Sequence, residues 1–287
     1  MLRFCVLLAL PSQLLAFEFF RTPEGTPCRW DLAKLPTQTI SWRVSEGSPE
    51  ILRESMRFAC LNWTLASANT INFVEGDGGV VITWAAPEIP EGTPAQTVLT
   101  TRGSSIVGAE ITINTKSFCW VRGTDSTKDA NDTRQELDLD AIVLHEMGHV
   151  LGLHHSDENP EATVGATNHF DYPTMNSIVF PSARSLHLDD MAGIRALYGI
   201  TAPLPELFVE ASPARGKSPL KVALFQTGGG ADTMWDLGNG SIAMGEKSKA
   251  RYRAPGFYTV TAESNGMTAT VIIEVTRKAK KQRRLQQ

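Results

Sequence analysis

Short runs of alternating apolar and polar residues predict β-strands in the first part of the chain. Residues 39–44 read Thr-Ile-Ser-Trp-Arg-Val, and residues 71–74 and 80–84 are equally rich in β-branched and aromatic side chains. A glycine-rich stretch between the last two predicts a turn. Residues 106–114 alternate in the same way. The pattern predicts a sheet built early in the chain.

Two stretches have the apolar spacing of helices. Pro49 begins the first, because proline is tolerated at the first helical position, and this helix is predicted to reach about Ala68. In the second, Leu137, Ala141 and Leu144 recur at the spacing of one helical face. The second helix is predicted to continue into the histidines that follow it.

The pattern changes after residue 200. Residues 201–206 contain two prolines and predict a short, stiff linker. Beyond it, no long helical pattern occurs, and strands separated by turns are predicted at residues 207–209, 220–225, 233–237, 257–262 and 268–275. Short strands at this spacing are typical of a β-sandwich.

Composition and the first residues indicate an exported globular protein. The 287 residues, 42% of them apolar, suffice for one or two domains. Arg3 precedes an apolar run that ends in small residues, which predicts a signal peptide at residues 1–16, cleaved after Ala16. A hydrophobic first strand is the alternative. The run is shorter than the roughly 20 residues of a transmembrane helix, so we expect a secreted, extracellular protein without a transmembrane segment.

Charge is distributed unevenly. The net charge is −4, but residues 277–287 hold six lysines and arginines. The rest of the chain therefore has a more negative net charge than the whole. A solvated, disordered basic tail is the simpler interpretation. An anchor for anionic glycans or membrane surfaces is the alternative. No aromatic residue lies in the tail, so base stacking has no support, and no nucleic-acid partner is expected.

Residues 145–155 fit H-E-x-x-H-x-x-G-x-x-H at every fixed position. His145 and His149 are one helical turn apart and face one side. Gly152 falls at the expected helix end, where a left-handed residue lets the chain turn and bring round His155. Three imidazoles and a water make an open zinc site, and Glu146, beside the first ligand, can take the proton of that water.

A closed structural zinc site or a set of core histidines is the alternative. A closed site would use four protein ligands, usually including cysteine. No cysteine lies near the motif, and a structural site has no need of Glu146. The sequence therefore favours a catalytic zinc.

On these residues the chain resembles the metzincin zinc endopeptidases, and it is most similar to their matrixin-like branch. Ser156 follows the third histidine, as in matrixins. Residues 172–176, Tyr-Pro-Thr-Met-Asn, resemble the Met-turn, and residues 186–199 resemble the closing helix L-x-x-D-D-x-x-G-I-x-x-L-Y-G. The resemblance implies protein or peptide substrates and a place for Met175 beneath the zinc, with plain core packing of Met175 as the alternative.

Several features depart from the matrixin pattern. The interval from His155 to Met175 is longer, so residues 158–170 are predicted to form an extra loop beside the active site. Ser177 stands two residues after Met175, where astacins and serralysins have a tyrosine, which argues against a tyrosine ligand. The remaining three histidines do not reproduce the loop that holds a second, structural zinc. One zinc ion is therefore expected.

Resemblance also assigns the substrate-binding edge. By it, residues 106–114 are the edge strand above the active-site cleft, and a peptide would add to that strand. The expected substrate-binding residues are Ile106, Val107, Gly108, Ala109 and Glu110. The alternative is an ordinary sheet edge, since only the place of this strand before the zinc helix favours the functional interpretation.

The last third resembles a PKD domain, an immunoglobulin-like module of secreted proteins. Residues 235–240, Trp-Asp-Leu-Gly-Asn-Gly, are close to the family's W-D-F-G-D-G, and residues 254–260 also match. Trp235 is expected in the core and Tyr258 at a structural corner. An extracellular glycan or protein is the expected class of ligand for this domain.

Carboxylates gather before the zinc helix, at Asp125, Asp129, Asp132, Asp138 and Asp140. Calcium is a candidate ion, because it prefers carboxylates and carbonyls. Their spacing fits no defined calcium loop, and a solvated acidic loop is the alternative.

Cleavage after Ala16 would remove Cys5 and leave an odd number of cysteines, so at most one internal disulfide is expected. Cys60 lies on the apolar face of the first helix and is expected to be a buried thiol. The expected pair is then Cys28 with Cys119. An inhibitory role for Cys28 on the zinc has little support, because the matrixin sequence Pro-Arg-Cys-Gly is absent.

The expected fold is an α+β metzincin catalytic domain, with a twisted mixed sheet, an active-site helix and a C-terminal helix, followed by an all-β immunoglobulin-like sandwich. The expected boundaries are a protease at residues 17–200, the linker at 201–206, the sandwich at 207–276 and the tail at 277–287. The expected function is a secreted, monomeric zinc endopeptidase in which Glu146 activates a zinc-bound water. The alternative is a catalytically inert secreted adhesive or extracellular-matrix-binding protein, although all four zinc-site residues are present.

Overall fold

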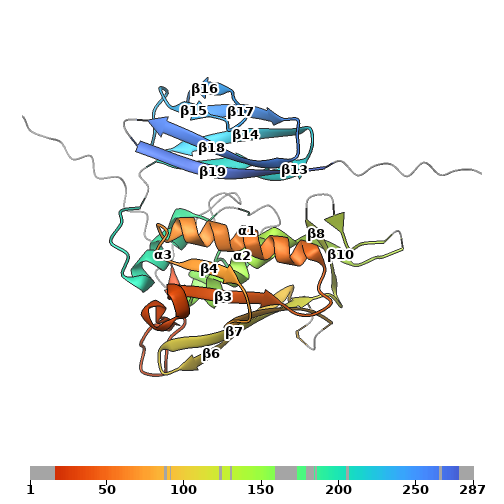
Figure 1. Ribbon diagram of the computed structural model, residues 1–287, viewed down its shortest axis with the longest axis vertical. Coiled ribbons are helices and arrows are strands. Elements are labelled where there is room, and N and C mark those ends of the chain that lie inside the picture. The colour runs from red at the N-terminus through yellow and green to blue at the C-terminus, as the bar shows by residue number, and fades with distance from the viewer. Residues whose placement is uncertain are drawn as a thin grey trace, which may run out of the picture.

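The computed structural model describes residues 17–86, 89–90, 92–122, 125–129, 131–158, 173–178, 184, 186–204, 207–264 and 267–277. The predicted signal peptide and nearly all of the predicted extra loop and basic tail lie outside these residues. Within them, a domain of helices and strands is followed by a domain of strands alone. Figure 1 shows the sheet and helices of the first domain below the blue strands of the second. The predicted fold class is confirmed.

The main sheet of the first domain has six strands in the order β2-β7-β5-β3-β4, with β6 paired to β7. The strands are β2 (Arg29–Trp30), β3 (Thr39–Val44), β4 (Asn72–Glu75), β5 (Val80–Ala85), β6 (Ala95–Arg102) and β7 (Ser105–Asn114). All pairs are parallel except β6 with β7, which is antiparallel. Among the described strands β6 has no second partner, so it forms the free edge.

The prediction that residues 106–114 form the edge strand is therefore wrong. They lie in β7, which is hydrogen-bonded to β6 along one side and to β2 and β5 along the other. Both sets of backbone groups are occupied, so a peptide cannot add to this strand. Residues 95–102, for which no strand was predicted, form β6 and take the edge position.

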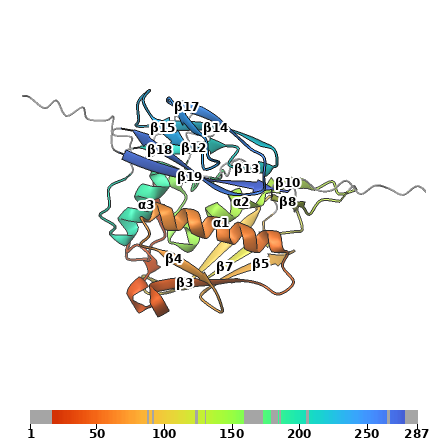
Figure 2. The same cartoon turned by 45° about the horizontal axis from the view of Figure 1, so that its top comes forward.

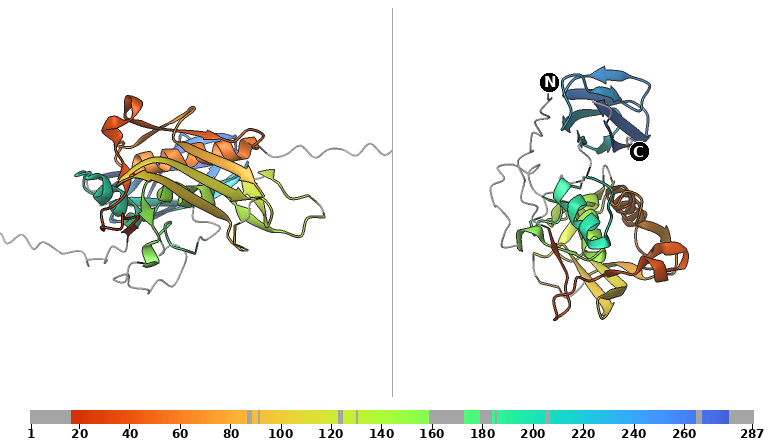
Figure 3. Two further views of the ribbon diagram at one scale, coloured as in Figure 1. Left: turned by 90° about the horizontal axis from the view of Figure 1, so that it is seen from below. Right: turned by 90° about the vertical axis from the view of Figure 1, so that its left-hand side faces the viewer.

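Two helices cover one face of the sheet, α1 (Glu50–Ala66) and α2 (Leu139–Val150), and a third, α3 (Leu188–Tyr198), follows. Figure 3, seen from below, shows the strands crossing over the helices. The buried indole of Trp63 in α1 donates to the carbonyl of Leu144 in α2 at 3.0 Å, which fastens the two helices together. No helix in the described ranges is long and apolar enough to cross a membrane.

The zinc-motif helix begins two residues later than its apolar spacing predicted. Leu137 belongs to strand β10 (Gln135–Asp138), which pairs with β8 (Phe118–Arg122). Asp138 then caps α2, since its carboxylate accepts from the backbone N–H of Ala141 at 3.1 Å. Strand pairing and the cap therefore set the helix start. Three shorter strands complete the domain, β9 (Asp125–Ser126), β1 (Glu18–Phe19) and β11 (Leu153–His154), and β1 pairs with β11.

The second domain is a sandwich of two sheets, ordered β12-β14-β17 and β13-β19-β18-β15-β16. Its strands are β12 (Phe208–Ser212), β13 (Arg215–Lys217), β14 (Leu220–Thr227), β15 (Met234–Asp236), β16 (Ile242–Met244), β17 (Lys247–Tyr252), β18 (Gly256–Ser264) and β19 (Met267–Thr276). Trp235 is fully buried in its core, and the Tyr258 hydroxyl donates to the carbonyl of Ala254 at 2.8 Å, as a corner residue should.

The three described cysteines, Cys28, Cys60 and Cys119, are free and buried. The predicted Cys28–Cys119 disulfide is therefore wrong. Cys28 lies just before β2 in the N-terminal segment, whereas the thiol of Cys119 in β8 donates to Asp132 at 2.9 Å. Burial raises the pKa of each thiol and keeps it protonated. Cys60 is the buried thiol that its helical position predicted.

A buried group of charges joins the two domains. Arg122 of β8 contacts Asp140 of α2 at 2.9 Å and Glu274 of β19 at 2.9 Å. Arg215 of β13 contacts the same Glu274 at 2.7 Å and faces Asp140 at 3.6 Å. Glu54 of α1 also belongs to the group, because its carboxylate lies 2.5 Å from the guanidinium of Arg122. Figure 2 shows β13 and β19 of the sandwich lying over the helices that supply these partners.

Glu274 bridges two arginines, so replacing it should lower the free energy of unfolding. Replacing Glu274 with alanine leaves two buried arginines, Arg122 and Arg215, with Asp140 and Glu54 as their remaining acidic partners. We expect a loss of about 3–5 kcal/mol in the free energy of unfolding. Chemical denaturation should show the sandwich separating before the catalytic domain, in two transitions. Glu263→Ala, on the neighbouring strand and exposed, is the control. An unchanged denaturation curve for Glu274→Ala would show that this cluster does not hold the domains together.

Candidate active site

The three histidines of the motif converge on one point. His145 and His149 come from successive turns of α2, and His155 follows β11. The rings of His145 and His149 have centroids 4.7 Å apart, and His155 lies 5.3 Å and 4.8 Å from them. One ligand atom from each residue falls within 4.8 Å of the others. The structure therefore brings together the ligand set that the sequence predicted.

Each ring is held by a hydrogen bond from its outer nitrogen. His145 Nδ1 lies 2.7 Å from the carbonyl of Thr174, and His149 Nδ1 lies 2.8 Å from the carbonyl of Leu153. A carbonyl can only accept, so both rings carry their proton on Nδ1 and leave Nε2 free as a ligand. Nδ1 of His155 lies 3.1 Å from Oε1 of Glu158. Such outer partners fix the tautomer and orientation of metal-binding histidines.

These residues suit zinc. The Nε2 atoms of His149 and His155 are 3.2 Å apart, and two ligands of a tetrahedral zinc at roughly 2.05 Å would be about 3.3 Å apart. Burial lowers the pKa of His145 to about 4 and also lowers that of His149, so both are neutral near pH 7. Neutral imidazole is the form that binds a metal.

Glu146 is buried beside the ligands. Burial raises the pKa of its carboxyl to about 7, although a hydrogen bond from Thr97 opposes the shift. The Thr97 hydroxyl, on β6, donates to Glu146 Oε2 at 2.5 Å. A carboxyl whose pKa is near neutrality can both take and return a proton. The structure therefore places a carboxyl with a pKa near neutrality beside the three histidines.

Two glycines make room around the motif. Gly152 has φ +101°, and a Cβ there would lie 2.2 Å from the carbonyl oxygen of Cys28. Gly148 faces Met175, and a Cβ there would lie 2.2 Å from the sulfur of Met175 and 2.8 Å from the ring of Trp63. Gly152 is therefore required for the turn, as predicted. Gly148 is required because Met175 packs directly against the zinc-motif helix.

The Met-turn is fastened by α3. The carboxylate of Asp190 accepts from the backbone N–H groups of Thr174 at 2.9 Å and Met175 at 3.0 Å. It also accepts from the N–H of His187 at 2.7 Å. Thr174 in turn holds His145 through its carbonyl. Asp190 of α3 thereby orients the ring of His145 through Thr174.

A cavity of about 450 Å³ opens beside the histidines and Glu146. Phe20 and Thr97 border it, and the edge strand β6 forms one side through Ala95 and Gln96. The ring of Phe20 lies edge-on to His149 at 5.5 Å and His154 at 4.5 Å. Sequence reasoning missed both Phe20 and Thr97. The β-branched residues Thr97, Val98, Thr100 and Thr101 are the signal that could have predicted the strand. Nothing near Phe20 predicts its contact with histidines far along the chain.

The five residues predicted to bind substrate do not border this cavity. Ile106 and Ala109 are buried in the sheet, and Val107 is exposed. Gly108 pairs with Thr100 of β6, and Glu110 accepts a hydrogen bond from Thr83 at 3.2 Å. Strand β6 lies between these residues and the open edge.

The predicted acidic cluster is divided among separate contacts. Asp132 binds Arg134 and Cys119, Asp138 caps α2 and pairs with Arg184, and Asp140 lies in the charge group between the domains. Within the described residues, the groups that could hold a metal ion are the triad of His145, His149 and His155, and a second group of His154, His155 and Glu158. The geometry accordingly favours a zinc site at the histidines over a calcium site at the predicted acidic cluster.

Comparison with known proteins agrees with this geometry. The family model for matrixins matches residues 37–199, and that for the PKD domain matches residues 206–271. Metalloendoproteinase 1 of Glycine max is 34% identical over 87 residues, which cover 28% of this chain and 23% of that protein.

Metalloendoproteinase 4-MMP of Arabidopsis thaliana is 37% identical over 65 residues, covering 22% of this chain and 16% of that protein. Stromelysin-1 of Equus caballus is 38% identical over 80 residues, covering 28% of this chain and 14% of that protein. The chain thus spans less than a quarter of the length of each of these relatives. Because the matrixin model covers more than half of the sequence, the chain belongs to the matrixin family, and it carries a PKD domain after its matrixin region.

Proposed function

We propose that this protein is a secreted zinc-dependent endopeptidase that hydrolyses peptide bonds in proteins. The observation that carries the proposal is the arrangement of His145, His149 and His155, whose outer nitrogens are engaged while their Nε2 atoms face one point beside Glu146. Three protein ligands leave one position of a tetrahedral zinc open, which is the pattern of catalytic sites. The names of the matrixin relatives support the same activity.

Each residue has a defined role in this proposal. His145, His149 and His155 hold one zinc ion, which when bound polarises the substrate carbonyl and lowers the pKa of a coordinated water. Glu146 takes the proton released at the attacking water and later returns it to the leaving amine. Met175 packs beneath the ligands against Gly148 and fixes the floor of the site.

The substrate would lie along β6. The outer backbone groups of this strand have no partner among the described strands, and Thr97 places the strand beside Glu146. An extended peptide can pair with such an edge by main-chain hydrogen bonds, which would hold its scissile carbonyl at the metal. This assignment moves the substrate-binding edge from residues 106–110 to residues 95–102.

The remaining parts of the proposal concern the surroundings of the enzyme. Secretion is supported by the predicted signal peptide and by the PKD domain, because PKD domains are typically extracellular modules. The sandwich would bind an extracellular protein or glycan, and its exposed apolar residues Met234, Ile242 and Met244, on the neighbouring strands β15 and β16, offer a surface for this. The enzyme is proposed to act as a monomer with one zinc ion.

Glu146→Gln tests the mechanism. The amide keeps the shape of the side chain but cannot accept a proton, so we expect kcat/KM on casein or gelatin to fall by a factor of about 10²–10⁴. Zinc content, measured by atomic absorption, should remain one ion per chain. Glu46→Gln, at an exposed turn, is the matched control and should keep full activity. An active Glu146→Gln protein would overturn the mechanism, and a zinc-loaded wild type that cuts no protein substrate would favour the inert adhesive protein.

Glu158→Gln tests the outer hydrogen bond of the third ligand. The Glu158 carboxylate reaches Nδ1 of His155 at 3.1 Å and Nδ1 of His154 at 3.2 Å, so it bridges two neighbouring rings. Without its charge, zinc affinity should fall about 10–100-fold. Competition with a chromogenic chelator would measure this change, again with Glu46→Gln as the control. Equal zinc affinity in Glu158→Gln and wild type would show that Glu158 does not orient His155.

A further inference from the structure

A second group of metal-binding side chains adjoins the catalytic histidines. It consists of His154, His155 and Glu158, and one ligand atom from each lies within 4.8 Å of the others. His154 ends β11, His155 follows it, and Glu158 ends the short 3-10 helix η3 (Ser156–Glu158). The fold therefore places a carboxylate and two imidazoles together, and His155 is the residue that this group shares with the catalytic triad.

The two nitrogens of the His155 ring face different groups. Nε2 lies 3.2 Å from Nε2 of His149, in the triad, whereas Nδ1 lies 3.1 Å from Oε1 of Glu158. The ring of His155 thus separates Glu158 from the position of the catalytic zinc. An ion held by Glu158 would consequently be a different ion from the catalytic one.

Glu158 has one carboxylate oxygen for each neighbouring ring. While Oε1 faces His155, Oε2 lies 3.2 Å from Nδ1 of His154. A carboxylate oxygen accepts, so a proton on Nδ1 of His154 makes this contact a hydrogen bond. The same separation suits two ligands of a tetrahedral zinc, which are about 3.3 Å apart. A zinc ion can take the place of the proton, which moves to Nε2 of the ring or to solvent, while the hydrogen bond from His155 to Oε1 remains.

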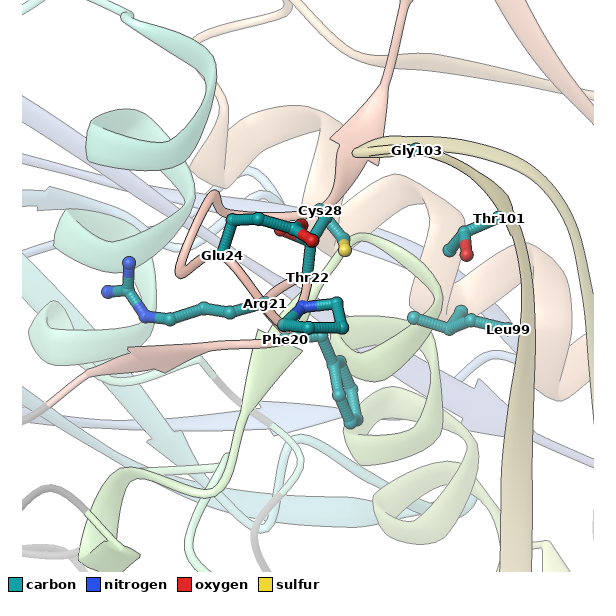
Figure 4. A pocket seen from close by; sticks show the side chains of 9 residues that line it. Phe20, Arg21, Thr22, Glu24, Cys28, Leu99, Thr101 and Gly103 are labelled. Carbon is teal, nitrogen blue, oxygen red and sulfur yellow. The ribbon is translucent and has the colours of Figure 1, made fainter.

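The ring of His154 is held in position by the segment around Phe20. The ring of Phe20 lies edge-on to it, with 4.5 Å between the centroids. Figure 4 shows the Phe20 ring directed away from Cys28 and Glu24. The backbone of His154 is fixed as well, because it lies opposite Glu18 in the pairing of β11 with β1. An imidazole that is oriented before the metal arrives loses less conformational freedom on binding.

The donor atoms favour zinc over calcium. Imidazole nitrogen and carboxylate oxygen are ordinary zinc ligands, whereas calcium takes a larger set of oxygens. Solvent can reach both side chains, since 28% of His154 and 54% of Glu158 is exposed. Two protein ligands leave the other positions to water, and a catalytic ion beyond His155 would repel a second cation. The second site should therefore be weaker than the catalytic site and fill when zinc is in excess.

An ion at this place would act on the catalytic site through Glu158. Zinc on Oε2 withdraws negative charge from the carboxylate that faces Nδ1 of His155 through Oε1. The outer hydrogen bond of the third catalytic ligand would then weaken. Bonds of this kind orient metal ligands and tune the activity of the metal that they hold.

We infer that His154 and Glu158 form a second, weaker zinc site whose occupation inhibits the enzyme. Binding of the second ion is independent of catalysis, whereas its inhibitory effect rests on the proposed endopeptidase function.

Equilibrium dialysis of the full chain against rising concentrations of zinc chloride tests the binding, with the zinc content determined by atomic absorption. The wild type should take up one ion and then a second. His154→Phe keeps a ring against Phe20 but has no nitrogen, so affinity for the second ion should fall at least about 10-fold. Uptake of the first ion should not change. His154→Asn, a smaller replacement, should give the same result.

Glu24→Gln is the matched control for the loss of a zinc-binding side chain. Glu24 is another exposed acid from the segment around Phe20. Its carboxylate lies beside Cys28 in Figure 4, on the side from which the Phe20 ring points away. This variant should take up both ions as the wild type does.

Hydrolysis of casein over the same range of zinc concentrations tests the inhibition. As the second ion binds, kcat/KM of the wild type should fall about 10-fold or more below its value with one zinc. The same zinc concentrations should leave His154→Phe at the kcat/KM of its own one-zinc form.

The outcomes separate this inference from the proposed function. Uptake of a single ion by the wild type would overturn the second site, as would equal uptake of the second ion by His154→Phe. Two bound ions without a loss of kcat/KM would overturn the inhibition. If the second ion binds through His154 but the one-zinc protein cuts no protein substrate, the metal site stands and the endopeptidase proposal fails.

Discussion

Asp190 places a buried carboxylate under the Met-turn, and the order of the catalytic site depends on it. Its two oxygens receive three backbone N–H groups, from Thr174, Met175 and His187. Those bonds hold the turn closed against the zinc-motif helix, where the sulfur of Met175 fills the space left by Gly148. The same turn presents the carbonyl that fixes the tautomer of His145. One carboxylate in the last helix thus organises residues on both sides of the metal position.

The zinc-motif helix is held at both of its ends by different means. At its start, Asp138 caps the helix and Asp140 joins the buried charges that reach into the sandwich. At its end, Gly152 turns the chain against the N-terminal segment. Since this helix carries His145, Glu146 and His149, restraints at its two ends fix the positions of all three side chains. The sandwich is part of this arrangement, because Arg215 and Glu274 complete the charge group around Arg122.

Much of this could be predicted from the sequence, and the failures have physical causes. The histidine motif is local in sequence, because helical periodicity and one glycine turn suffice to bring its residues together. Five of the eight described sandwich strands were also predictable from alternation and turns, whereas β13, β16 and β17 were not predicted. The edge strand was not recognised, because a strand facing both a cleft and solvent has little apolar contrast, as Thr97, Leu99 and Thr101 illustrate. Contacts such as Arg122 with Glu274, or Phe20 with His149, join distant segments and leave no local pattern to read.

The pairing of β1 with β11 has a thermodynamic consequence. Strand β11 carries His154 and leads directly to His155, and β1 leads directly to Phe20, whose ring lies against His149 and His154. A ligand that orders one of these strands orders the other, so a metal bound by the histidines and a peptide bound beside Phe20 would draw on a common conformational entropy. Linkage requires the effect to be reciprocal: whatever free energy the metal adds to the binding of the peptide, the peptide adds to the binding of the metal. In the proposed enzyme, substrate and zinc would be cooperative ligands of one small β-ladder.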